Sequence, residues 1–592
     1  MRVLRFFFKL LFVVLAVLGG TMVLLALTAF IGWRLLPSYG KSVPDRTLLA
    51  FDLADGVIER EPADLLQRLT QGRALPMRTV TVALEAAGHD DRVKGLLLRL
   101  GSGRVGIGQV QELREAIRAF HAQSKSVTCF AEDFGEDGNG TLRLDLAAGC
   151  DEIWMQPSGE VGLIGFTLET PFVKNALDKL GIRAQMDHRE DYKGAVNTLT
   201  SAAMPAPQRE NMQQLVDSWL AQVSRDIGEG RKMAEADVRA LIDGGPYLAE
   251  QAVSLKLIDK LGYRDQADEA AKLHVGGAET MSLADYAAVL PEPPSDAPRI
   301  ALIYGLGDIE LGGEADEGLL SRAAMRSGIM RAALSDAIDD ADIKAIVLRI
   351  DSPGGSYVAS DTIWREVQRA REKNKPLFVS MGNMAASGGY MIAAPARAIV
   401  ADAGTLTGSI GVFGGKIVLK DLWDLLGIHW DGVKAGANAD IDSANTPFSP
   451  AGWQHLQASL DFVYADFMRR VADGRKLTAE ATRAVAKGQI WTGADARERG
   501  LVDELGGLST ALRLARNSAG IPLGTAVRIE QFPAPETGIG LALRQLLRAS
   551  LVEAGLGPAV AGWSRSLGDI AALLAVTDGT SATLRLPALR QR

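Results

Sequence analysis

The chain has 592 residues, more than one hydrophobic core usually organises, so we expect at least two domains. Hydrophobic residues make up 47% of the sequence and charged residues 23%, which excludes a disordered chain and a polytopic membrane protein. Lysine and arginine number 64 against 72 aspartates and glutamates. The net charge of −8 offers no broad basic surface, so nucleic acid is not an expected partner.

The first predicted element is a transmembrane helix at residues 10–33. This stretch of 24 residues carries no charge, and about 20 helical residues are enough to cross a bilayer. Arg2, Arg5 and Lys9 precede it, so the positive-inside bias predicts a cytoplasmic N-terminus at residues 1–9. We therefore expect a retained signal anchor with the rest of the chain outside the cytoplasm. The alternative is a long signal peptide that is removed.

Beyond this segment the chain contains a tandem repeat. The strand-like run at 93–103 matches the run at 343–355, and residues 150–166 match residues 396–413 at nearly the same spacing. In each copy, strand-like runs alternate with helix-like ones, and glycine turns join a strand to the next helix. The pattern predicts two homologous α/β domains with mainly parallel sheets.

The domain limits follow from the repeat and from a proline-rich linker at 290–298. We predict a first α/β repeat at 47–289 and a second at 299–533. Residues 534–592 leave the repeat and form a C-terminal tail, for which the sequence indicates no role.

Three glycine-rich motifs of the second repeat are candidates for chemistry. DSPGG at 351–355 joins a strand to a helix, where backbone N–H groups can hold an anionic oxygen. It lacks the GxxxxGK[ST] pattern, so an oxyanion hole is at least as good an interpretation as a phosphate site. ASGGY contains Ser387 and GSIG contains Ser409, both among small residues that let a substrate backbone approach. Tight helix packing explains the same small residues.

A nucleophilic serine needs a base, and none of the six histidines lies in a recognisable catalytic motif. The sequence has no HExxH motif and no cluster with metal-ligand spacing, so we expect neither a metal nor a cofactor. A neutral lysine can take the place of histidine. At its ordinary pKa of about 10.4, only about 0.04% of a lysine is neutral at pH 7. Such a lysine must therefore be buried away from acids.

The motifs DSPGG, ASGGY and GSIG, in this order in a duplicated chain, resemble the long, two-repeat form of the signal peptide peptidase A family. The resemblance implies a crotonase/Clp-protease-like α/β spiral, assembled as a homotetramer and requiring no cofactor. It also implies a serine endopeptidase with a Ser–Lys dyad that degrades cleaved signal peptides. The enzyme would be anchored in the bacterial cell membrane with its catalytic domains outside the cytoplasm.

The resemblance also implies the site residues. The nucleophile is the serine of GSIG, which is Ser409 here, and the general base is the lysine of DYKGAV, which is Lys193. Backbone N–H groups of Gly354 or Gly355, and of Ile410, would stabilise the oxyanion.

The repeat provides a check on this pair. Leu163 stands opposite Ser409, 246 positions earlier, so the first repeat lacks the nucleophile. The same spacing from Lys193 reaches Ala439, so the second repeat lacks the base. Each repeat retains one member of the pair, which favours a single active site built by both.

Two rival residues remain. Ser387 lies in a motif that resembles the nucleophile motif of Clp proteases, and Lys434 is a lysine five positions out of register with Lys193. Two other functions also remain: a crotonase-superfamily acyl-CoA enzyme, against which the anchor argues, and a non-catalytic membrane scaffold.

Cys129 and Cys150 both lie beside strand-like runs. We interpret them as buried hydrophobic residues, with an extracytoplasmic disulfide as the alternative. Two cysteines make neither a disulfide scaffold nor a four-thiolate zinc site.

Overall fold

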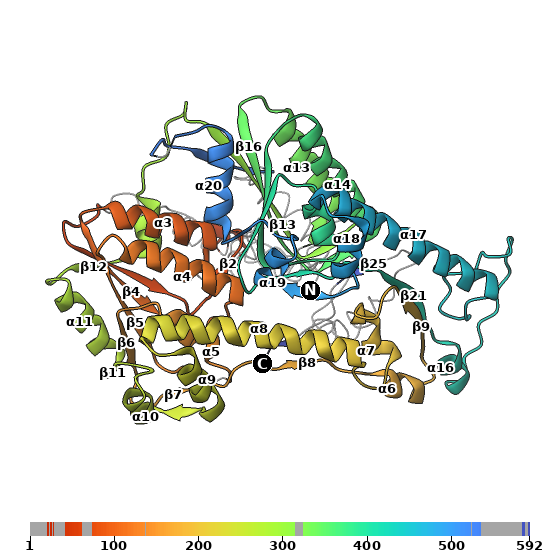
Figure 1. Ribbon diagram of the computed structural model, residues 1–592, viewed down its shortest axis with the longest axis horizontal. Helices are drawn as coiled ribbons and strands as arrows, with labels where there is room; N and C mark the ends of the chain where they lie inside the picture. The colour runs from red at the N-terminus through yellow and green to blue at the C-terminus, as the bar shows by residue number, and fades with distance from the viewer. Residues whose placement is uncertain are drawn as a thin grey trace, which may run out of the picture.

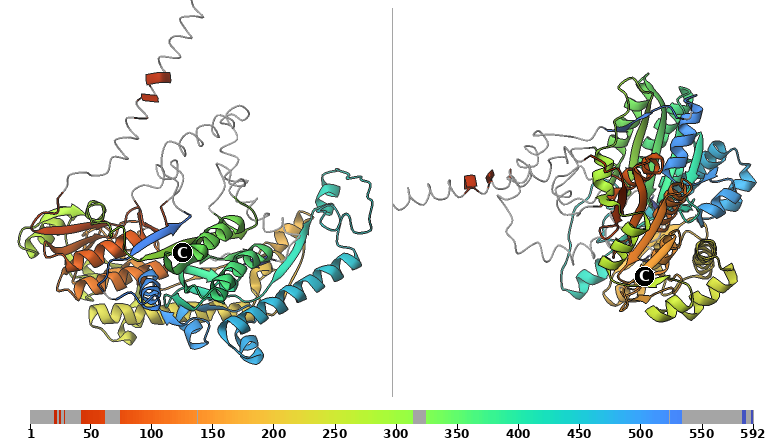
Figure 2. Two further views of the ribbon diagram at one scale, coloured as in Figure 1. Left: turned by 90° about the horizontal axis from the view of Figure 1, so that it is seen from above. Right: turned by 90° about the vertical axis from the view of Figure 1, so that its left-hand side faces the viewer.

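The computed structural model describes residues 20–22, 24, 25, 28, 42–61, 74–136, 138–313, 324–522, 524–533, 583–585 and 590–591. The predicted anchor at 10–33 lies mostly outside these residues. Within them, no helix is both long and apolar enough to cross a membrane. The sheet of the first repeat lies at the left of Figure 1 and that of the second at the upper centre, and Figure 2 shows the same arrangement from two further sides.

The first repeat is built on a six-stranded sheet in the order β11-β6-β5-β4-β1-β12, with every neighbouring pair parallel. Strand β4, for example, contains three consecutive leucines at 96–98 and is buried along most of its length. Such continuous apolar runs are typical of parallel strands covered on both faces. The strands are β1 (Thr47–Asp52), β4 (Val93–Arg99), β5 (Ser126–Ala131), β6 (Glu152–Met155), β11 (Lys260–Leu261) and β12 (Glu279–Ser282).

The second repeat has the same topology. Its parallel strands follow the order β23-β19-β18-β16-β13-β24, which matches the first sheet strand for strand. The strands are β13 (Arg299–Leu306), β16 (Ile343–Ser352), β18 (Leu377–Ala386), β19 (Ala398–Ala401), β23 (Glu504–Leu505) and β24 (Arg528–Phe532). Two short strands, β20 (Leu406–Gly408) and β22 (Ile490–Thr492), extend the sheet beside the end of β18. The predicted α/β class and tandem duplication are confirmed.

Helices cover both faces of each sheet. In the first repeat, Ala271 of α11 packs with Leu48 and Leu97 on one face, and α3 and α4 cover the other. In the second repeat, α20 takes the place of α11 and packs Ala511 with Val347. The helices of the first repeat are α3 (Met77–His89), α4 (Ile107–His121), α5 (Thr141–Ala147), α6 (Lys174–Lys179), η1 (Gly194–Val196), α7 (Asn197–Thr200), α8 (Ala206–Arg231), α9 (Glu235–Gly244), α10 (Ala249–Ser254), α11 (Arg264–His274) and α12 (Leu283–Ala288). Those of the second are α13 (Ser327–Asp339), α14 (Tyr357–Glu372), α15 (Gly388–Ala393), α16 (Lys420–Leu425), α17 (Pro450–Arg475), α18 (Ala479–Val485), α19 (Gly493–Glu498) and α20 (Leu508–Ser518).

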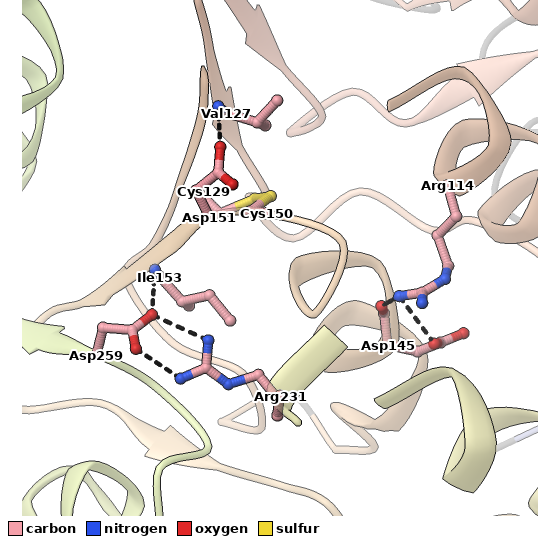
Figure 3. Close-up of a disulfide and its surroundings, with 9 residues drawn as sticks. All are labelled: Arg114, Val127, Cys129, Asp145, Cys150, Asp151, Ile153, Arg231 and Asp259. Carbon is pink, nitrogen blue, oxygen red and sulfur yellow. Dashed lines mark hydrogen bonds and ion pairs between the residues drawn. A yellow bond between two sulfur atoms is a disulfide. The ribbon is translucent and has the colours of Figure 1, made fainter. Parts of the chain in front are cut away.

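The repeats also share side-chain networks. Asp259 accepts hydrogen bonds from Arg231 at 2.6 Å and from the backbone N–H of Ile153 at 2.8 Å (Figure 3). The second repeat has the same network, formed by Asp503, Arg475 and Ile399. Each arginine ends a 26-residue helix, α8 or α17, and holds it against the sheet.

Figure 3 also shows the two cysteines joined by a disulfide. The Cα atoms of Cys129 and Cys150 are 6.0 Å apart, and both side chains lie in the core of the first repeat. The prediction that they are buried is confirmed, but they are paired rather than two separate hydrophobic residues.

A third sheet connects the two repeats. Strand β9 (Arg183–His188) leaves the first repeat and pairs antiparallel with β21 (Phe413–Val418) of the second, at the right of Figure 1. The sheet continues in the order β15-β14-β17-β25-β21-β9. Its other strands are β14 (Asp308–Glu310), β15 (Ala324–Arg326), β17 (Gly354–Ser356) and β25 (Thr583–Arg585). Three small pairs join β2 (Val57–Ile58) to β3 (Leu75–Pro76), β7 (Glu160–Val161) to β10 (Tyr247–Leu248), and β8 (Leu168–Glu169) to β26 (Arg590–Gln591).

A buried ion cluster around Arg349 of β16 joins the two repeats. Arg349 of the second repeat is fully buried and forms ion pairs with Glu59, at 2.9 Å, and with Glu112. Both glutamates belong to the first repeat. Because burying a charge is costly unless it is paired, removal of Arg349 would leave Glu59 and Glu112 buried without their cation.

Candidate active site

Lys193 follows strand β9, the strand of the first repeat that pairs with β21 of the second repeat. The backbone N–H of Tyr192 donates to the carbonyl of Lys487 at 3.2 Å. Gly488 approaches so closely that a Cβ atom on it would lie 2.5 Å from the backbone nitrogen of Lys193. Its φ of +82° also favours glycine. These contacts hold the lysine in the second repeat although the first repeat supplies it.

The amine of Lys193 is in contact with both candidate serines. Its Nζ lies 2.8 Å from Ser387 Oγ, 3.0 Å from Ser409 Oγ and 2.8 Å from the carbonyl oxygen of Ser409. All three side chains are fully buried. Burial lowers the pKa of Lys193 well below its usual 10.5, because the ammonium form loses its hydration. The site therefore favours the neutral amine that serine activation requires.

Ser387 occupies the turn between β18 and α15. Its backbone has φ 56° and ψ −114°, a conformation that residues with a side chain rarely adopt. A serine on such a sharp strand-to-helix turn is the geometry of a nucleophile elbow. The backbone is held there by a 2.8 Å hydrogen bond from Ser387 N to the carbonyl of Gly408.

Ser409 lies between β20 and β21, also at a positive φ of 51°. Its N–H donates to the carbonyl of Gln489 at 2.6 Å. Both its hydroxyl and its carbonyl are within hydrogen-bond distance of Lys193 Nζ. Ser409 thus contacts the amine of Lys193 with two oxygen atoms, whereas Ser387 contacts it with one.

The predicted oxyanion residues have different surroundings. The N–H of Gly354 donates to Ser352 Oγ at 3.2 Å. Gly355 lies beside the residue after Ser387, since a Cβ on Gly388 would be 3.4 Å from Gly355 N. Ile410 is buried in the core of the second repeat. The backbone of Gly355 therefore lies close to the turn that contains Ser387.

The rival base is excluded by its position. Lys434 is half exposed and forms an ion pair with Asp440 at 2.9 Å, so it is neither buried nor free of acids. In the described part of the chain, no group of three or more His, Cys, Asp or Glu side chains is suited to hold a metal ion.

A model of the family described as peptidase family S49 matches residues 120–277 and 369–522, which together exceed half of the chain. The chain belongs to peptidase family S49. This S49 protein is 34% identical over 453 residues to Protease 4 of Salmonella typhi, covering 74% of this chain and 71% of the relative. Serine protease SPPA, chloroplastic, of Arabidopsis thaliana is 30% identical over 537 residues, covering 88% and 75%. Protease 4 of Haemophilus influenzae is 31% identical over 472 residues, covering 76% and 74%. The chain is thus an SppA-type serine protease, in agreement with the resemblance seen in its motifs.

Proposed function

We propose that this S49 protease cleaves peptides through a Ser–Lys dyad in which Lys193 is the general base. The observation that carries the proposal is the position of Lys193 Nζ, within 3.0 Å of two serine hydroxyls in a fully buried site. Since one chain contributes both the lysine and the serines, the dyad needs no second subunit. The lowered pKa of this lysine supports its role as a proton acceptor at neutral pH.

We assign the attack on the substrate to Ser387 rather than to Ser409. Its strained turn, its 2.8 Å contact with Nζ and its place beside Gly355 support this assignment. Ser409, with two oxygens on Nζ, would instead orient the amine. The sequence-based choice of Ser409 as nucleophile remains the alternative, with Ile410 as its oxyanion donor.

In the proposed reaction, neutral Lys193 takes the proton of Ser387 Oγ as this oxygen attacks the peptide carbonyl. The backbone N–H groups of Gly388 and Gly355 stabilise the tetrahedral oxyanion. The ammonium of Lys193, held by both oxygens of Ser409, then gives its proton to the leaving amine. In deacylation Lys193 takes a proton from water as the water oxygen attacks the ester carbonyl. When the ester C–O bond breaks, the ammonium of Lys193 gives this proton to Ser387 Oγ, which releases the acid and restores the free serine.

For the substrate we propose cleaved signal peptides, presented at a membrane by an anchor at residues 10–33. The uncharged run of 24 residues and the family motifs support this reading. The disulfide between Cys129 and Cys150 is typical of proteins outside the cytoplasm, which supports extracytoplasmic catalytic domains. A crotonase/Clp-like spiral and a homotetramer complete the proposal on the same family resemblance.

The test is covalent labelling of the full chain in detergent with a fluorophosphonate probe, followed by peptide mass mapping. We expect the label on Ser387, and its loss in Lys193→Ala. The matched control is Lys434→Ala, which removes an exposed lysine and should be labelled like the parent. Label on Ser409 would overturn the choice of nucleophile, and labelling that persists in Lys193→Ala would overturn the dyad.

A second measurement addresses the substrate. The parent enzyme should degrade a synthetic signal peptide in detergent micelles and leave an intact, folded precursor uncut, because only a flexible chain can enter a buried site. Equal cleavage of both would contradict the proposed substrate class.

A further inference from the structure

The strand that leads to Ser387 contains a bulge. β16 and β18 pair in regular parallel register up to Ile350 and Met381. Before the pairing resumes, the single residue Asp351 of β16 stands opposite residues 382–384 of β18. Extra residues of this kind bend a strand and redirect the residues that follow them. Ser387 follows this bulge by three residues, so the bulge sets the direction from which β18 enters the serine turn.

The side chain of Asp351 fills the bulge. Its Oδ1 accepts a hydrogen bond from the backbone N–H of Met384 at 3.0 Å. A Cβ atom on Gly382 would lie 3.1 Å from Cγ of Asp351, so the carboxyl group packs directly on the first residue of the bulge. A buried N–H without a partner is costly, and here the carboxyl oxygen takes the place of a strand carbonyl. The aspartate thus holds the bulge in one conformation.

Asp351 also begins the DSPGG motif, which carries the proposed oxyanion donor Gly355. β16 therefore leads to the oxyanion glycine, and β18 leads to the serine. The two meet where the backbone nitrogen of Gly355 approaches Gly388, the residue after Ser387. The hydrogen bond from Met384 to Asp351 joins these two strands just before they reach the site. It couples the position of the serine to that of the oxyanion donor.

The first repeat provides an internal comparison. In the matching run of that repeat, residues 93–103 against 343–355, the position of Asp351 is taken by Gly101. The corresponding strands β4 and β5 pair in regular register up to Arg99 and Phe130, with no shift along the ladder. The aspartate and the bulge thus occur together in the repeat that carries the candidate serines, and the other repeat has a glycine and a regular ladder there.

Other residues hold the first part of the bulge. The hydroxyl of Thr405 donates to the carbonyl of Gly382 at 2.7 Å. The backbone N–H of Gln109, in α4 of the first repeat, donates to Asn383 Oδ1 at 3.3 Å. These contacts fix residues 382 and 383 from outside β16. The last residue of the bulge, Met384, has its N–H on Asp351, and it is the one nearest to the serine.

The hydrogen bond does not depend on the charge of Asp351. Burial and the nearby charge of Glu59 raise the pKa of this carboxyl to about 7, while Arg349 opposes the shift and Glu112 adds to it. Near neutral pH the group therefore exists in both forms, and each form keeps an oxygen that can accept from Met384. An asparagine, which has the same shape and a carbonyl oxygen, should replace it.

We propose that Asp351 is a positioning residue of the protease site: through its hydrogen bond to Met384 it fixes the bulge of β18, and so it holds Ser387 in place beside Gly355. This inference rests on the proposed function, since it takes Ser387 as the nucleophile. The aspartate acts through the strand and the serine turn, and it takes no part in proton transfer.

The test compares Asp351→Ala with Asp351→Asn in the full chain in detergent. The alanine variant should lower kcat for a fluorogenic peptide on the order of 10²-fold with little change in KM, because a misplacement of about 1 Å at the reacting atoms has an effect of this size. The asparagine variant keeps the acceptor and should restore kcat to within about threefold of the parent. Equal kcat values for Asp351→Ala and the parent, or an asparagine variant as slow as the alanine variant, would overturn the proposal.

The matched control is Asp503→Ala. Asp503 belongs to the same repeat and also accepts a backbone N–H of the sheet, that of Ile399, at 2.7 Å. Ile399 pairs with Val379 near the start of β18, at the far end from the serine. Loss of this contact should lower the free energy of unfolding and leave kcat of the folded enzyme unchanged. If Asp351→Ala does not fold, Asp351→Ser takes its place: its hydroxyl is one bond shorter than the carboxyl oxygen, so it should fall short of Met384 and show the same loss of kcat.

The rate of fluorophosphonate labelling separates this inference from the proposed function. We expect the label on Ser387 in every variant, with labelling slowed in Asp351→Ala by about the same factor as kcat and restored in Asp351→Asn. Label on Ser387 at the parent rate in Asp351→Ala would overturn the role of Asp351 and leave the dyad intact. Label on Ser409 in the parent would overturn the proposed nucleophile, and this inference with it.

Discussion

Alanine substitution of the two serines that contact Lys193 Nζ should lower kcat by very different amounts. In Ser387→Ala the proposed nucleophile is gone, and loss of the nucleophile in serine proteases lowers kcat by on the order of 10⁶-fold. In Ser409→Ala the nucleophile remains, and only one of the contacts on Nζ disappears. The size of the loss therefore identifies the role of each residue.

The expected fall in rate for Ser409→Ala follows from the hydrogen bonds that this substitution removes and keeps. The substitution removes the hydroxyl at 3.0 Å but keeps the carbonyl of residue 409 at 2.8 Å and Ser387 Oγ at 2.8 Å. A hydrogen bond to a charged group contributes about 1.5–3 kcal/mol. If the transition state, in which Nζ is an ammonium, loses this amount, the rate falls about 10- to 150-fold. That is several orders of magnitude less than the loss expected for Ser387→Ala.

The assay is hydrolysis of a fluorogenic peptide by the full chain, with kcat and KM measured separately. Ser224→Ala is the matched control: this serine of α8 is also fully buried, and its hydroxyl has no hydrogen-bond partner among the described residues. Its substitution should leave kcat unchanged. A 10⁶-fold loss in Ser409→Ala with a loss near 100-fold in Ser387→Ala would refute the reasoning and identify Ser409 as the nucleophile.

Three further predictions concern the base, the contact between repeats and the cysteines. Because only neutral Lys193 accepts a proton, kcat/KM should rise with pH through the lowered pKa and level off well below pH 10.5; a profile that rises only near pH 10.5 would contradict this. Arg349→Met should lower the free energy of unfolding, measured in urea, by about 3–5 kcal/mol, because it leaves Glu112 buried without its cation. The double variant Arg349→Met, Glu112→Gln should recover part of this loss. Non-reducing peptide mapping should recover Cys129 and Cys150 in one linked peptide; alkylation of both without a reductant would contradict the pairing.

Much of the fold could be predicted from the sequence because duplication leaves a local signature. The runs that become β4 and β16 are mostly apolar and are each followed by a glycine turn, and they match each other at nearly the same spacing as the other repeated segments. Such patterns depend on neighbours in the chain, since a strand buried on both faces needs apolar residues throughout. The absence of a matching lysine in the second repeat likewise indicated one shared site around Lys193.

The proposal of Ser387 as nucleophile draws on the tertiary structure. Ser387 and Ser409 lie in similar small-residue motifs, and the sequence-based preference for Ser409 rested on family resemblance. Both have a positive φ, and they differ in that Ser387 joins a strand to a helix beside Gly355, whereas Ser409 contacts Nζ with two oxygen atoms. These contacts are not local properties, because each arises where segments distant in the sequence meet.

The sequence by itself therefore determined the α/β class and the duplication, and with the family resemblance it predicted Lys193 as the base that the second repeat lacks. Only the tertiary structure decided how that lysine reaches its serines, through the pairing of β9 with β21 across the two repeats. It also placed β25 between β17 and β21. Local patterning follows from which residues must be buried, whereas a contact between residues 194 and 216 positions apart depends on how the sheets pack against each other.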